Sequence, residues 1–529
     1  MQDDFVRRNL PPPEQWPRLL FDGPGLDFPP RLNACLELLD RAVAEGHGER
    51  IAVYGQSEAW SYRELQDRVD RLARVLREQL GLVPGNRVLL RGANSPWLAA
   101  CWLAVWKAGG VAVGSMPLLR AKELRQILQQ AQVSHALCAA SLHAELELAA
   151  ADCPTLRQVL LVGDADFEQR LAAASPGFET YDSAADDPSL IAFTSGTTGV
   201  PKGCVHAHRD VLAMCEVFPR HCLKPSQDDV FIGTPPLAFT FGLGGLLCFA
   251  LHARAATVLL ESPTPPRLLE AIARHRATIC VTSPTGYRQL AALGDRDSLR
   301  SLRKCVSAGE ALNLATRQQW RAVSDAGMYD GVGGTEMMHI YIASSPEDYR
   351  EGAVGRVLPG YQARLVDGDM RDVPVGQTGY LAVRGPTGCR YLADERQTRY
   401  VRDGWNLTGD TYHADADGYF YYHARVDDMI ITSGYNVAGP EVESVLLEHP
   451  AVADCAVIGV PDEARGQIVK AFVVLREGFA GDQDLVAQLQ DYVKNHAAPY
   501  KYPRAIRFVT ELPRTETGKL QRFRLKDSP

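Results

Sequence analysis

The sequence predicts an α/β protein, with a large N-terminal domain of two stacked α/β subdomains and a small β-barrel, followed by an α+β C-terminal domain. From Ile51 to Ser307, short apolar strands alternate with amphipathic helices, a pattern typical of sheets covered by helices. Between about Val354 and Gly385 the helical period vanishes, and apolar and polar residues alternate around glycine and proline. Beyond Arg425 both signals return over a segment of about 100 residues, an ordinary size for a small domain.

Composition and charge exclude several classes of protein. The chain has 529 residues, more than one core accommodates, and 46% of them are hydrophobic and 23% charged, as in globular proteins. A net charge of -8 argues against non-specific binding to nucleic acid or to a membrane surface. The 12 cysteines contain no C-x-x-C pair, so we expect reduced, mostly buried thiols.

The most apolar stretch, Trp97–Gly114, contains Lys107 and two adjacent glycines. We interpret it as a core helix followed by a strand and not as a membrane span. The first residues lack the apolar region of a secretory signal. We therefore expect a cytoplasmic protein that binds neither nucleic acid nor membrane.

Local signals place the elements in chain order. Residues 1–30 are rich in proline and should form an extended arm on the body. Ser61 and Glu64 form a capping-box pattern that opens a helix, and Ser95 with Pro96 starts another. Strands are expected at Ile51–Tyr54, Arg87–Leu90, Val111–Val113, His135–Cys138, Val159–Val162, Ala277–Val281, Lys304–Ser307, Val357–Val366, Tyr380–Arg384, Cys455–Gly459, Val469–Leu475 and Ala505–Val509, and late helices at Pro440–Glu448 and Leu485–His496.

The stretch Leu190–Gly203 joins a short buried strand, Leu190–Phe193, to a loop of hydroxyl and glycine residues that ends in a lysine. Free backbone N–H groups, hydroxyls and one ammonium suit a polyphosphate. The loop is not a Walker A motif, because Pro201 precedes Lys202 and Gly203 follows it. A polar hairpin is the alternative interpretation.

A glycine turn at Asp330–Glu336 does not fit a dinucleotide fingerprint, because Glu336 stands where the third glycine would fall. A turn that presents a hydroxyl and a carboxylate suits a phosphate and a magnesium ion, with Thr335 toward the phosphate and Glu336 toward the metal. A capped turn with a solvated glutamate is the alternative.

Charged residues at three later positions are further candidates. Asp410 closes a strand-turn segment that begins at Trp405, and its carboxylate can accept hydrogen bonds from both hydroxyls of a ribose. Arg425 could contact the same ribose. Lys519 lies in a glycine-containing loop near the C-terminus. Surface ion pairs and a solvated tail lysine are the alternatives.

Taken together, these motifs resemble the acyl-adenylate-forming superfamily, which comprises acyl- and aryl-CoA synthetases, peptide-synthetase adenylation domains and luciferases. The resemblance covers essentially the whole chain. Residues 239–245, 330–341 and 427–437 are similar to benzoate-CoA and 2-aminobenzoate-CoA ligases, and residues 498–504 to the 2-aminobenzoate type. The chain departs from the family at Ala424, where glycine is common, and in the start of the loop at Phe193 and Thr194.

The resemblance implies an ATP-dependent aryl-CoA ligase that uses ATP, Mg²⁺ and coenzyme A. An aromatic carboxylate first forms an aryl-adenylate with release of diphosphate, and the thiol of coenzyme A then displaces AMP. Lys519, Thr335 and Glu336 would be catalytic, with Lys519 bridging the carboxylate and the α-phosphate and Glu336 holding Mg²⁺. The implied ATP and AMP contacts are Thr194, Ser195, Gly196, Thr197, Thr198, Lys202, Ala308, Gly309, Glu310, Asp330, Gly331, Asp410 and Arg425.

The same resemblance implies a pocket for the acid, a coenzyme A site and a hinge. Residues 1–424 would form the adenylating domain, 425–428 the hinge with Asp427 as pivot, and 429–529 the mobile C-terminal domain. The implied pocket residues are Phe239, Phe241, Tyr287, Gly333, His339 and Ile340, although plain core packing is the alternative for two of the aromatic residues. The candidate coenzyme A contacts are Ser433, Gly434, Tyr435, Arg465, Lys470, Lys501 and Arg504.

Three questions stay open at this point. The acid is 2-aminobenzoate, benzoate or another carboxylic acid, and the acceptor is coenzyme A or a carrier protein. A non-catalytic nucleotide sensor on the same fold is a further alternative, against which the presence of Lys519, Glu336 and Asp410 argues. The protein is expected to be a monomer or a homodimer.

Overall fold

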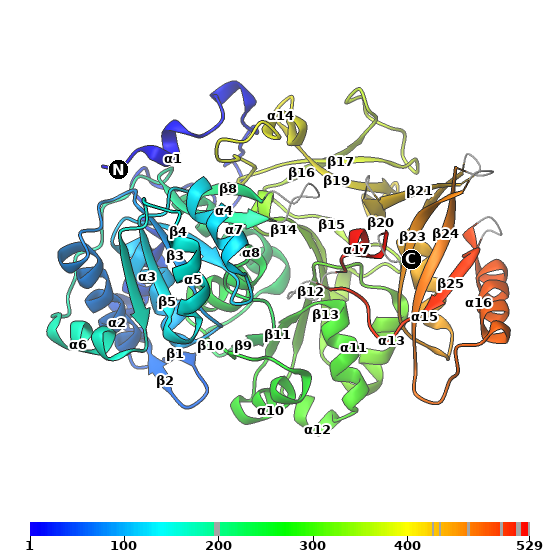
Figure 1. Ribbon diagram of the computed structural model, residues 1–529, viewed down its shortest axis with the longest axis horizontal. Coiled ribbons are helices and arrows are strands. Elements are labelled where there is room, and N and C mark those ends of the chain that lie inside the picture. Colours follow the sequence, from blue (N-terminus) through cyan, green and yellow to red (C-terminus); the bar gives the residue numbers. More distant parts are fainter. Residues whose placement is uncertain are drawn as a thin grey trace.

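The computed structural model describes residues 1–194, 201–425, 428–432, 435–462, 466–497, 501–514 and 520–526. Over these residues the chain forms four sheets with helices packed on them, which confirms the α/β class. Figure 1 shows the sheets of the larger N-terminal part at the left and centre and the C-terminal part at the right-hand end of the long axis.

The first sheet has the strand order β6-β5-β3-β4-β7-β8. Its strands run parallel except β8, which forms an antiparallel hairpin with β7. Helices α4 and α5 cover one face through an apolar cluster of their own. The strands are β3 (Arg87–Arg91), β4 (Val111–Ser115), β5 (His135–Ala139), β6 (Gln158–Val162), β7 (Pro188–Thr194) and β8 (Lys202–Ala207).

The second sheet has the order β15-β14-β13-β12-β11-β9-β10-β1-β2, with parallel strands from β13 to β1 and antiparallel strands at both edges. Helices α10, α11 and α13 pack on its outer face. The strands are β1 (Ile51–Tyr54), β2 (Ala59–Ser61), β9 (Val230–Gly233), β10 (Ala256–Val258), β11 (Ile279–Thr282), β12 (Lys304–Ala308), β13 (Gly327–Gly333), β14 (Ile340–Ser344) and β15 (Arg356–Val357).

One large hydrophobic core lies between these two sheets and joins them into a stack. It contains Leu90 of the first sheet, Val281 of the second and Trp102 of the helix between them. Burying apolar area of this extent is the main stabilising contribution to such a fold. The two stacked subdomains predicted from the alternating pattern are therefore confirmed.

The helices begin where their capping signals predict. Ser61 and Glu64 form the predicted capping box of α2, and the Ser95 side chain accepts from the Leu98 N–H at the start of α3. The α-helices of this part are α1 (Phe5–Arg8), α2 (Tyr62–Arg74), α3 (Pro96–Lys107), α4 (Ala121–Gln130), α5 (His143–Ala150), α6 (Ala165–Ala173), α7 (His208–Phe218), α8 (Thr240–Gly242), α9 (Phe249–His252), α10 (Pro265–His275), α11 (Pro284–Leu293), α12 (Arg296–Leu299), α13 (Leu314–Val323) and α14 (Gln397–Tyr400).

The stretch Trp97–Gly114 folds as predicted, into α3 followed by β4. None of the helices in the described part of the chain has both the length and the apolarity that crossing a membrane requires. All twelve cysteines are free, and all but Cys222 are buried, as expected. The N-terminal arm contains α1 and crosses the body, where Arg18 N–H donates to Gly404 O (Figure 1).

A small antiparallel sheet forms the third unit, with the order β16-β17-β19-β18 and β20 paired to β19. The prediction that Asp410 closes its segment is wrong, because β19 continues to Ala414. Gly409 instead has φ +79° inside the strand, and the ladder register shifts beside Thr411, as at a bulge. The strands are β16 (Gln362–Val366), β17 (Gly379–Arg384), β18 (Val401–Arg402), β19 (Trp405–Ala414) and β20 (Phe420–Arg425).

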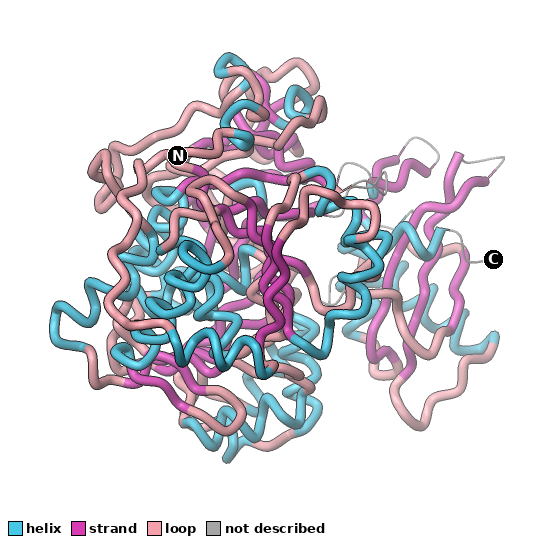
Figure 2. The backbone as a smooth tube through the Cα atoms, turned by 60° about the vertical axis from the view of Figure 1, so that its left-hand side comes forward, coloured by secondary structure: helices cyan, strands magenta, loops and turns pink. Residues whose placement is uncertain are grey.

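The C-terminal part has its own sheet, in the order β22-β21-β24-β23 with β25 parallel to β24. Helices α15 and α16 pack on one face and α17 on the other, and Figure 2 shows this part as a lobe beside the larger body. The elements are β21 (Met429–Thr432), β22 (Tyr435–Ala438), α15 (Gly439–Glu448), β23 (Val452–Asp462), β24 (Gly466–Leu475), α16 (Gln483–His496), β25 (Ala505–Phe508) and α17 (Arg522–Lys526).

Candidate active site

A turn between β13 and β14 carries two predicted catalytic residues, Thr335 and Glu336. They begin a short 3-10 helix (η8, Thr335–Met337), after which Met338 adopts φ +67° and ψ −48°. The His339 N–H closes a γ-turn by donating at 2.8 Å to the carbonyl two residues earlier. This backbone shape costs about 1–3 kcal/mol in a non-glycine residue and persists only where its surroundings fix it.

Buried side chains from two other units fix that turn. His206 Nε2 lies 2.7 Å from the Thr335 carbonyl, and the Thr387 hydroxyl donates to the Met337 carbonyl at 2.7 Å. Burial opposes protonation of His206, but neighbouring Cys204 and the Asp210 carboxylate raise its pKa well above the usual range. Because a carbonyl oxygen can only accept, His206 Nε2–H is the donor to the turn.

Lys202, the first residue of β8, faces Glu336 from the first sheet. Its Nζ lies 3.6 Å from Glu336 Oε1, and the Tyr391 hydroxyl donates to the same oxygen at 2.7 Å. In the β7–β8 hairpin Thr194 lies opposite Lys202, and Thr194 Oγ1 is buried without a hydrogen-bond partner among the described residues. The remaining loop positions, Ser195, Gly196, Thr197 and Thr198, lie outside the described residues.

Asp410 and Arg425 pair across β19 and β20, as their predicted shared ligand requires. They are cross-strand partners, and Arg425 Nη1 lies 3.5 Å from Asp410 Oδ1. Burial raises the pKa of Tyr341 well above its usual range, and the charges of Asp410 and Glu336 raise it further. The structure thus gathers Lys202, Glu336, Asp410 and Arg425 in one neighbourhood.

The ends of β12 and β13 bring together the backbone of several predicted ATP and AMP contacts. Ala308 pairs with Gly331, and Gly309 has φ +87°. A Cβ on Gly331 would meet Ile340 Cδ1 at 2.6 Å, so only glycine permits this close packing. The Asp330 carboxyl is buried 3.6 Å from Arg317 of α13, and burial raises its pKa to about 7.

Two side chains bind the Glu310 carboxylate. It accepts from the Thr285 hydroxyl at 2.7 Å and pairs with Arg514 of the C-terminal part at 2.5 Å. Arg514 also pairs with Asp454, which contacts Arg288 of α11 at 3.2 Å. These ion pairs connect the C-terminal part to the larger body.

The predicted coenzyme A residues are only partly described. Lys501 Nζ pairs with Glu441 at 2.7 Å, Lys470 lies over the Phe472 ring, and Arg504 donates to the Tyr502 hydroxyl. Tyr435 contributes its backbone to β22. The positions Ser433, Gly434 and Arg465, the pivot Asp427 and the catalytic candidate Lys519 lie outside the described residues.

An aromatic cluster surrounds His339, which follows the catalytic turn. The rings of Phe249, Phe241 and Phe218 lie 4.6, 5.6 and 6.3 Å from the imidazole. His339 Nε2 is 3.4 Å from the Phe241 carbonyl, while Nδ1 is buried with no partner in the described part of the chain. Burial lowers the His339 pKa to about 4, so the ring is neutral and Nδ1 is an acceptor.

The other predicted pocket residues have different places. Ile340 begins β14 opposite Gly333, and Phe239 precedes α8. Tyr287 belongs to the outer core of the second sheet, where its ring packs on Trp320 and its hydroxyl donates to the Cys280 and Val306 carbonyls. For Tyr287 the core alternative is the one that the structure shows.

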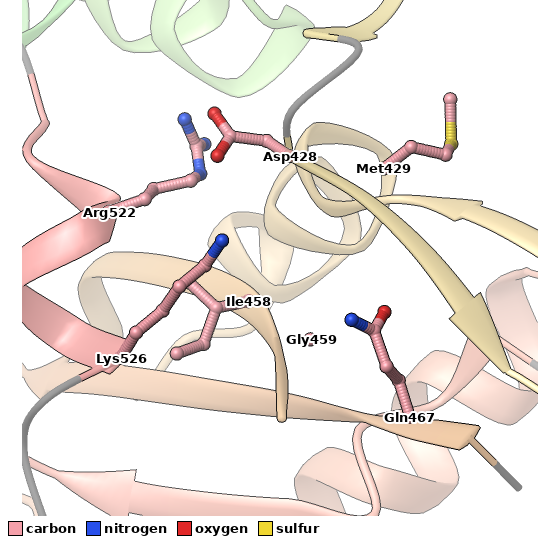
Figure 3. Close-up of a pocket in the computed structure, with 7 residues that line it drawn as sticks. All are labelled: Asp428, Met429, Ile458, Gly459, Gln467, Arg522 and Lys526. Carbon is pink, nitrogen blue, oxygen red and sulfur yellow. The ribbon is translucent and has the colours of Figure 1, made fainter. Parts of the chain in front are cut away.

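A small pocket lies in the C-terminal part, and neither Glu336 nor Lys202 lines it (Figure 3). The side chains of Arg522 and Lys526 come from α17, and Gln467 comes from β24. Arg522 is already neutralised, because its guanidinium binds both oxygens of Glu443 at 2.7 Å. Among the described lining residues, only Asp428 belongs to the predicted site, as part of the hinge segment 425–428.

Sequence reasoning missed the residues that support the site. Lys202, Cys204 and His206 alternate along β8, so the period of a strand could have placed His206 on the same face as Lys202. Thr387 and Tyr391 follow β17 and are remote in sequence from the residues they bind. No local pattern marks them.

Comparison with known proteins gives concordant matches. The sequence profile of AMP-binding enzymes matches residues 40–391, and that of the AMP-binding enzyme C-terminal domain matches residues 441–519. The chain is 35% identical over 514 residues to benzoate–CoA ligase of Thauera aromatica, covering 96% of this chain and 98% of that protein.

Solved structures agree with this similarity. The anthranilate CoA ligase AuaEII in complex with anthranoyl-AMP superposes with a TM-score of 0.90 at 33% identity, covering 95% of this chain and 98% of that one. A benzoate CoA ligase from Burkholderia xenovorans LB400 gives a TM-score of 0.87 at 31% identity, covering 94% of this chain and 100% of that one.

The core position of Tyr287 yields a prediction. Tyr287→Phe removes a hydroxyl that two buried carbonyls accept from, and should destabilise the fold by about 1–3 kcal/mol. The KM for an aromatic acid should not change, because the ring does not reach the His339 cluster. Thermal unfolding and steady-state kinetics measure both quantities. A several-fold rise in KM with an unchanged unfolding temperature would show instead that Tyr287 lines the acid pocket.

Proposed function

The chain belongs to the AMP-binding enzyme family and is an AMP-forming acid–CoA ligase, and we propose that its acid is aromatic, of the 2-aminobenzoate or benzoate type. The observation that carries the proposal is the aromatic cluster around His339, directly after the turn with Glu336. Aromatic side chains pack favourably against a flat aromatic ring. The free cysteines agree with a reducing compartment, and we place the enzyme in the cytoplasm.

The first half-reaction needs electrostatic help and no general base. A carboxylate is ionised at neutral pH, and its oxygen attacks the α-phosphate of ATP while diphosphate leaves. Negative charge then grows on the phosphoryl oxygens and the leaving group. We assign Lys202 and the loop from Thr194 to Thr198 to the β- and γ-phosphates, and Lys519 to the carboxylate and the α-phosphate.

The residues around the turn fit a magnesium ion. In the residues that the structure describes, no group of three or more His, Cys, Asp or Glu is placed to hold a metal alone. Mg²⁺ is usually held by one or two carboxylates together with substrate phosphates and water, and Glu336 supplies such a carboxylate. When bound, the ion would neutralise charge on the phosphates. Thr335 remains the proposed phosphate contact.

Two further groups would orient the nucleotide. The Asp410 carboxylate can accept hydrogen bonds from both ribose hydroxyls, and Arg425 lies beside it at 3.5 Å. The backbone of Ala308, Gly309, Asp330 and Gly331 would contact the nucleotide. These assignments follow the family resemblance and agree with the neighbourhood in which the residues lie.

His339 bears on which aromatic acid is used. Its neutral ring directs Nε2–H to the Phe241 carbonyl and leaves Nδ1 as an acceptor. A ring amino or hydroxyl group on the acid can donate to Nδ1, whereas a carboxylate cannot. This favours 2-aminobenzoate over benzoate.

For the second half-reaction we propose that residues 429–529 rotate about the hinge 425–428, with Asp427 as pivot. Rotation would withdraw Lys519 and bring Ser433, Gly434 and Tyr435 toward the pantetheine of coenzyme A, with Arg465 and Lys501 near its phosphates. The Glu310–Arg514 pair connects the two parts and must open in such a motion.

A panel of acids tests the substrate. With ATP, Mg²⁺ and coenzyme A, release of AMP should be faster with 2-aminobenzoate, benzoate and 2-hydroxybenzoate than with hexanoate. The hydrogen bond to His339 should raise kcat/KM for 2-aminobenzoate about 10-fold over benzoate. An acyl-CoA product without added protein excludes a carrier-protein acceptor. A preference for hexanoate would contradict the aromatic assignment.

Lys519→Ala separates the two half-reactions. Loss of the cation that bridges carboxylate and α-phosphate should slow adenylate formation by about 100- to 1,000-fold. Thioester formation from a supplied aryl-adenylate should be largely spared, because Lys519 is withdrawn in that step. Acid-dependent diphosphate exchange and single-turnover thioester formation give the two rates. Equal loss in both would contradict the role.

Asp427→Pro tests whether rotation about the hinge is needed for the second half-reaction. Proline fixes φ near −65° and restricts the preceding residue, so the segment should rotate less freely. Thioester formation should fall more than diphosphate exchange. An unchanged rate of thioester formation in this variant would contradict the role of Asp427 in the hinge.

A further inference from the structure

We propose that Tyr391 is a positioning residue for the triphosphate end of ATP, because its phenol bridges the Lys202 ammonium and the Glu336 carboxylate. The inference rests on the proposed function, since it concerns where ATP and Mg²⁺ bind. It assigns a role to a residue that neither the motifs nor the predicted site contain. The residue touches the two charged groups and acts through them.

The bridge follows from the hydrogen-bond chemistry of three groups. Lys202 Nζ donates to the Tyr391 hydroxyl oxygen at 3.0 Å, and that hydroxyl donates to Glu336 Oε1 at 2.7 Å. An ammonium has no acceptor and an ionised carboxylate has no donor, so this direction is the one that chemistry allows. Lys202 Nζ also lies 5.0 Å from the centroid of the Tyr391 ring.

The bridge matters because its two ends carry opposite charge. Lys202 and Glu336 are 3.6 Å apart and mostly shielded from water, with side-chain exposures of 21% and 14%. Without the phenol, the ammonium would approach the carboxylate directly and take the position that a cation should share with it. In a closed ion pair, Lys202 would compete with Mg²⁺ for the Glu336 carboxylate. Glu336 would likewise compete with the phosphate for the Lys202 ammonium. Tyr391 hydrogen-bonds to both groups and holds them 3.6 Å apart, farther than a direct hydrogen bond between them would be.

The Tyr391 hydroxyl has a fixed position relative to Lys202. Residue 391 forms a β-bridge with Cys204, the second residue after Lys202 on β8. The flanking bonds are Val205 N–H to Arg390 O and Leu392 N–H to Gly203 O, each 2.8 Å, and the Tyr391 N–H donates to Gln397 Oε1 at 2.9 Å. The side chain is fully buried.

Other buried tyrosines show what a purely structural role looks like. The hydroxyl of Tyr62 donates to the Ala255 carbonyl, and that of Tyr287 to two strand carbonyls. Tyr391 is as deeply buried as these, yet among the described residues its hydroxyl bonds to two charged side chains of the proposed ATP site. This contrast provides a matched control.

The experiment compares Tyr391→Phe with Tyr62→Phe, each of which removes one buried hydroxyl. Calorimetry measures the Kd for ATP at several Mg²⁺ concentrations without acid, and two assays measure acid-dependent diphosphate exchange and thioester formation from a supplied aryl-adenylate. Tyr391→Phe should raise the Kd for ATP, and the Mg²⁺ concentration at which ATP binding is half-maximal, about 5- to 30-fold. It should also slow diphosphate exchange, while the rate of thioester formation stays unchanged. Tyr62→Phe should change neither the Kd for ATP, nor its Mg²⁺ dependence, nor either rate.

A double-mutant cycle on the Kd for ATP keeps the test decisive if packing changes. Because the phenol acts through the carboxylate, the effects of Tyr391→Phe and Glu336→Gln should not add. Additive effects, equal loss in both half-reactions, or a Tyr391→Phe variant that matches Tyr62→Phe would overturn the inference. Wild-type enzyme that shows no exchange with any acid would instead overturn the proposed function.

Discussion

Two opposite charges held side by side, the Lys202 ammonium and the Glu336 carboxylate, are the constraint on which the site depends. They come from different sheets, since Lys202 opens β8 of the first sheet and Glu336 follows β13 of the second. Their separation of 3.6 Å is maintained only if both sheets keep their mutual position. The shared core between the sheets, which includes Trp102 and Val281, provides that rigidity.

The turn with Glu336 is fixed by every unit of the larger body. His206 reaches it from the first sheet, Gly331 and Ile340 confine it within the second, and Thr387 and Tyr391 approach from the segment after β17. Such convergence explains how the left-handed backbone at Met338 is tolerated. Preorganised charge of this kind suits a reaction whose barrier is mainly electrostatic.

Much of the fold could be predicted from the sequence, because alternation and capping are local. The box at Ser61 and Glu64, the cap at Ser95 and predicted strands such as Lys304–Ser307 follow from residues within one turn or one strand. The site was predicted less completely. The glycine-rich sequence around Asp330 does not indicate that its carboxyl lies beside Arg317. A tyrosine such as Tyr287 fits a core and a pocket equally well in the sequence. Tyr391 lies next to Glu336 only because of the tertiary fold.

Transfer of an oxygen atom tests the central claim most directly. With the acid labelled with ¹⁸O in its carboxylate, attack on the α-phosphate and later expulsion of AMP by coenzyme A leave one labelled oxygen in AMP. Mass spectrometry of the products should find that label in AMP and none in diphosphate. Unlabelled AMP formed together with the thioester would contradict an adenylate assembled between these charges.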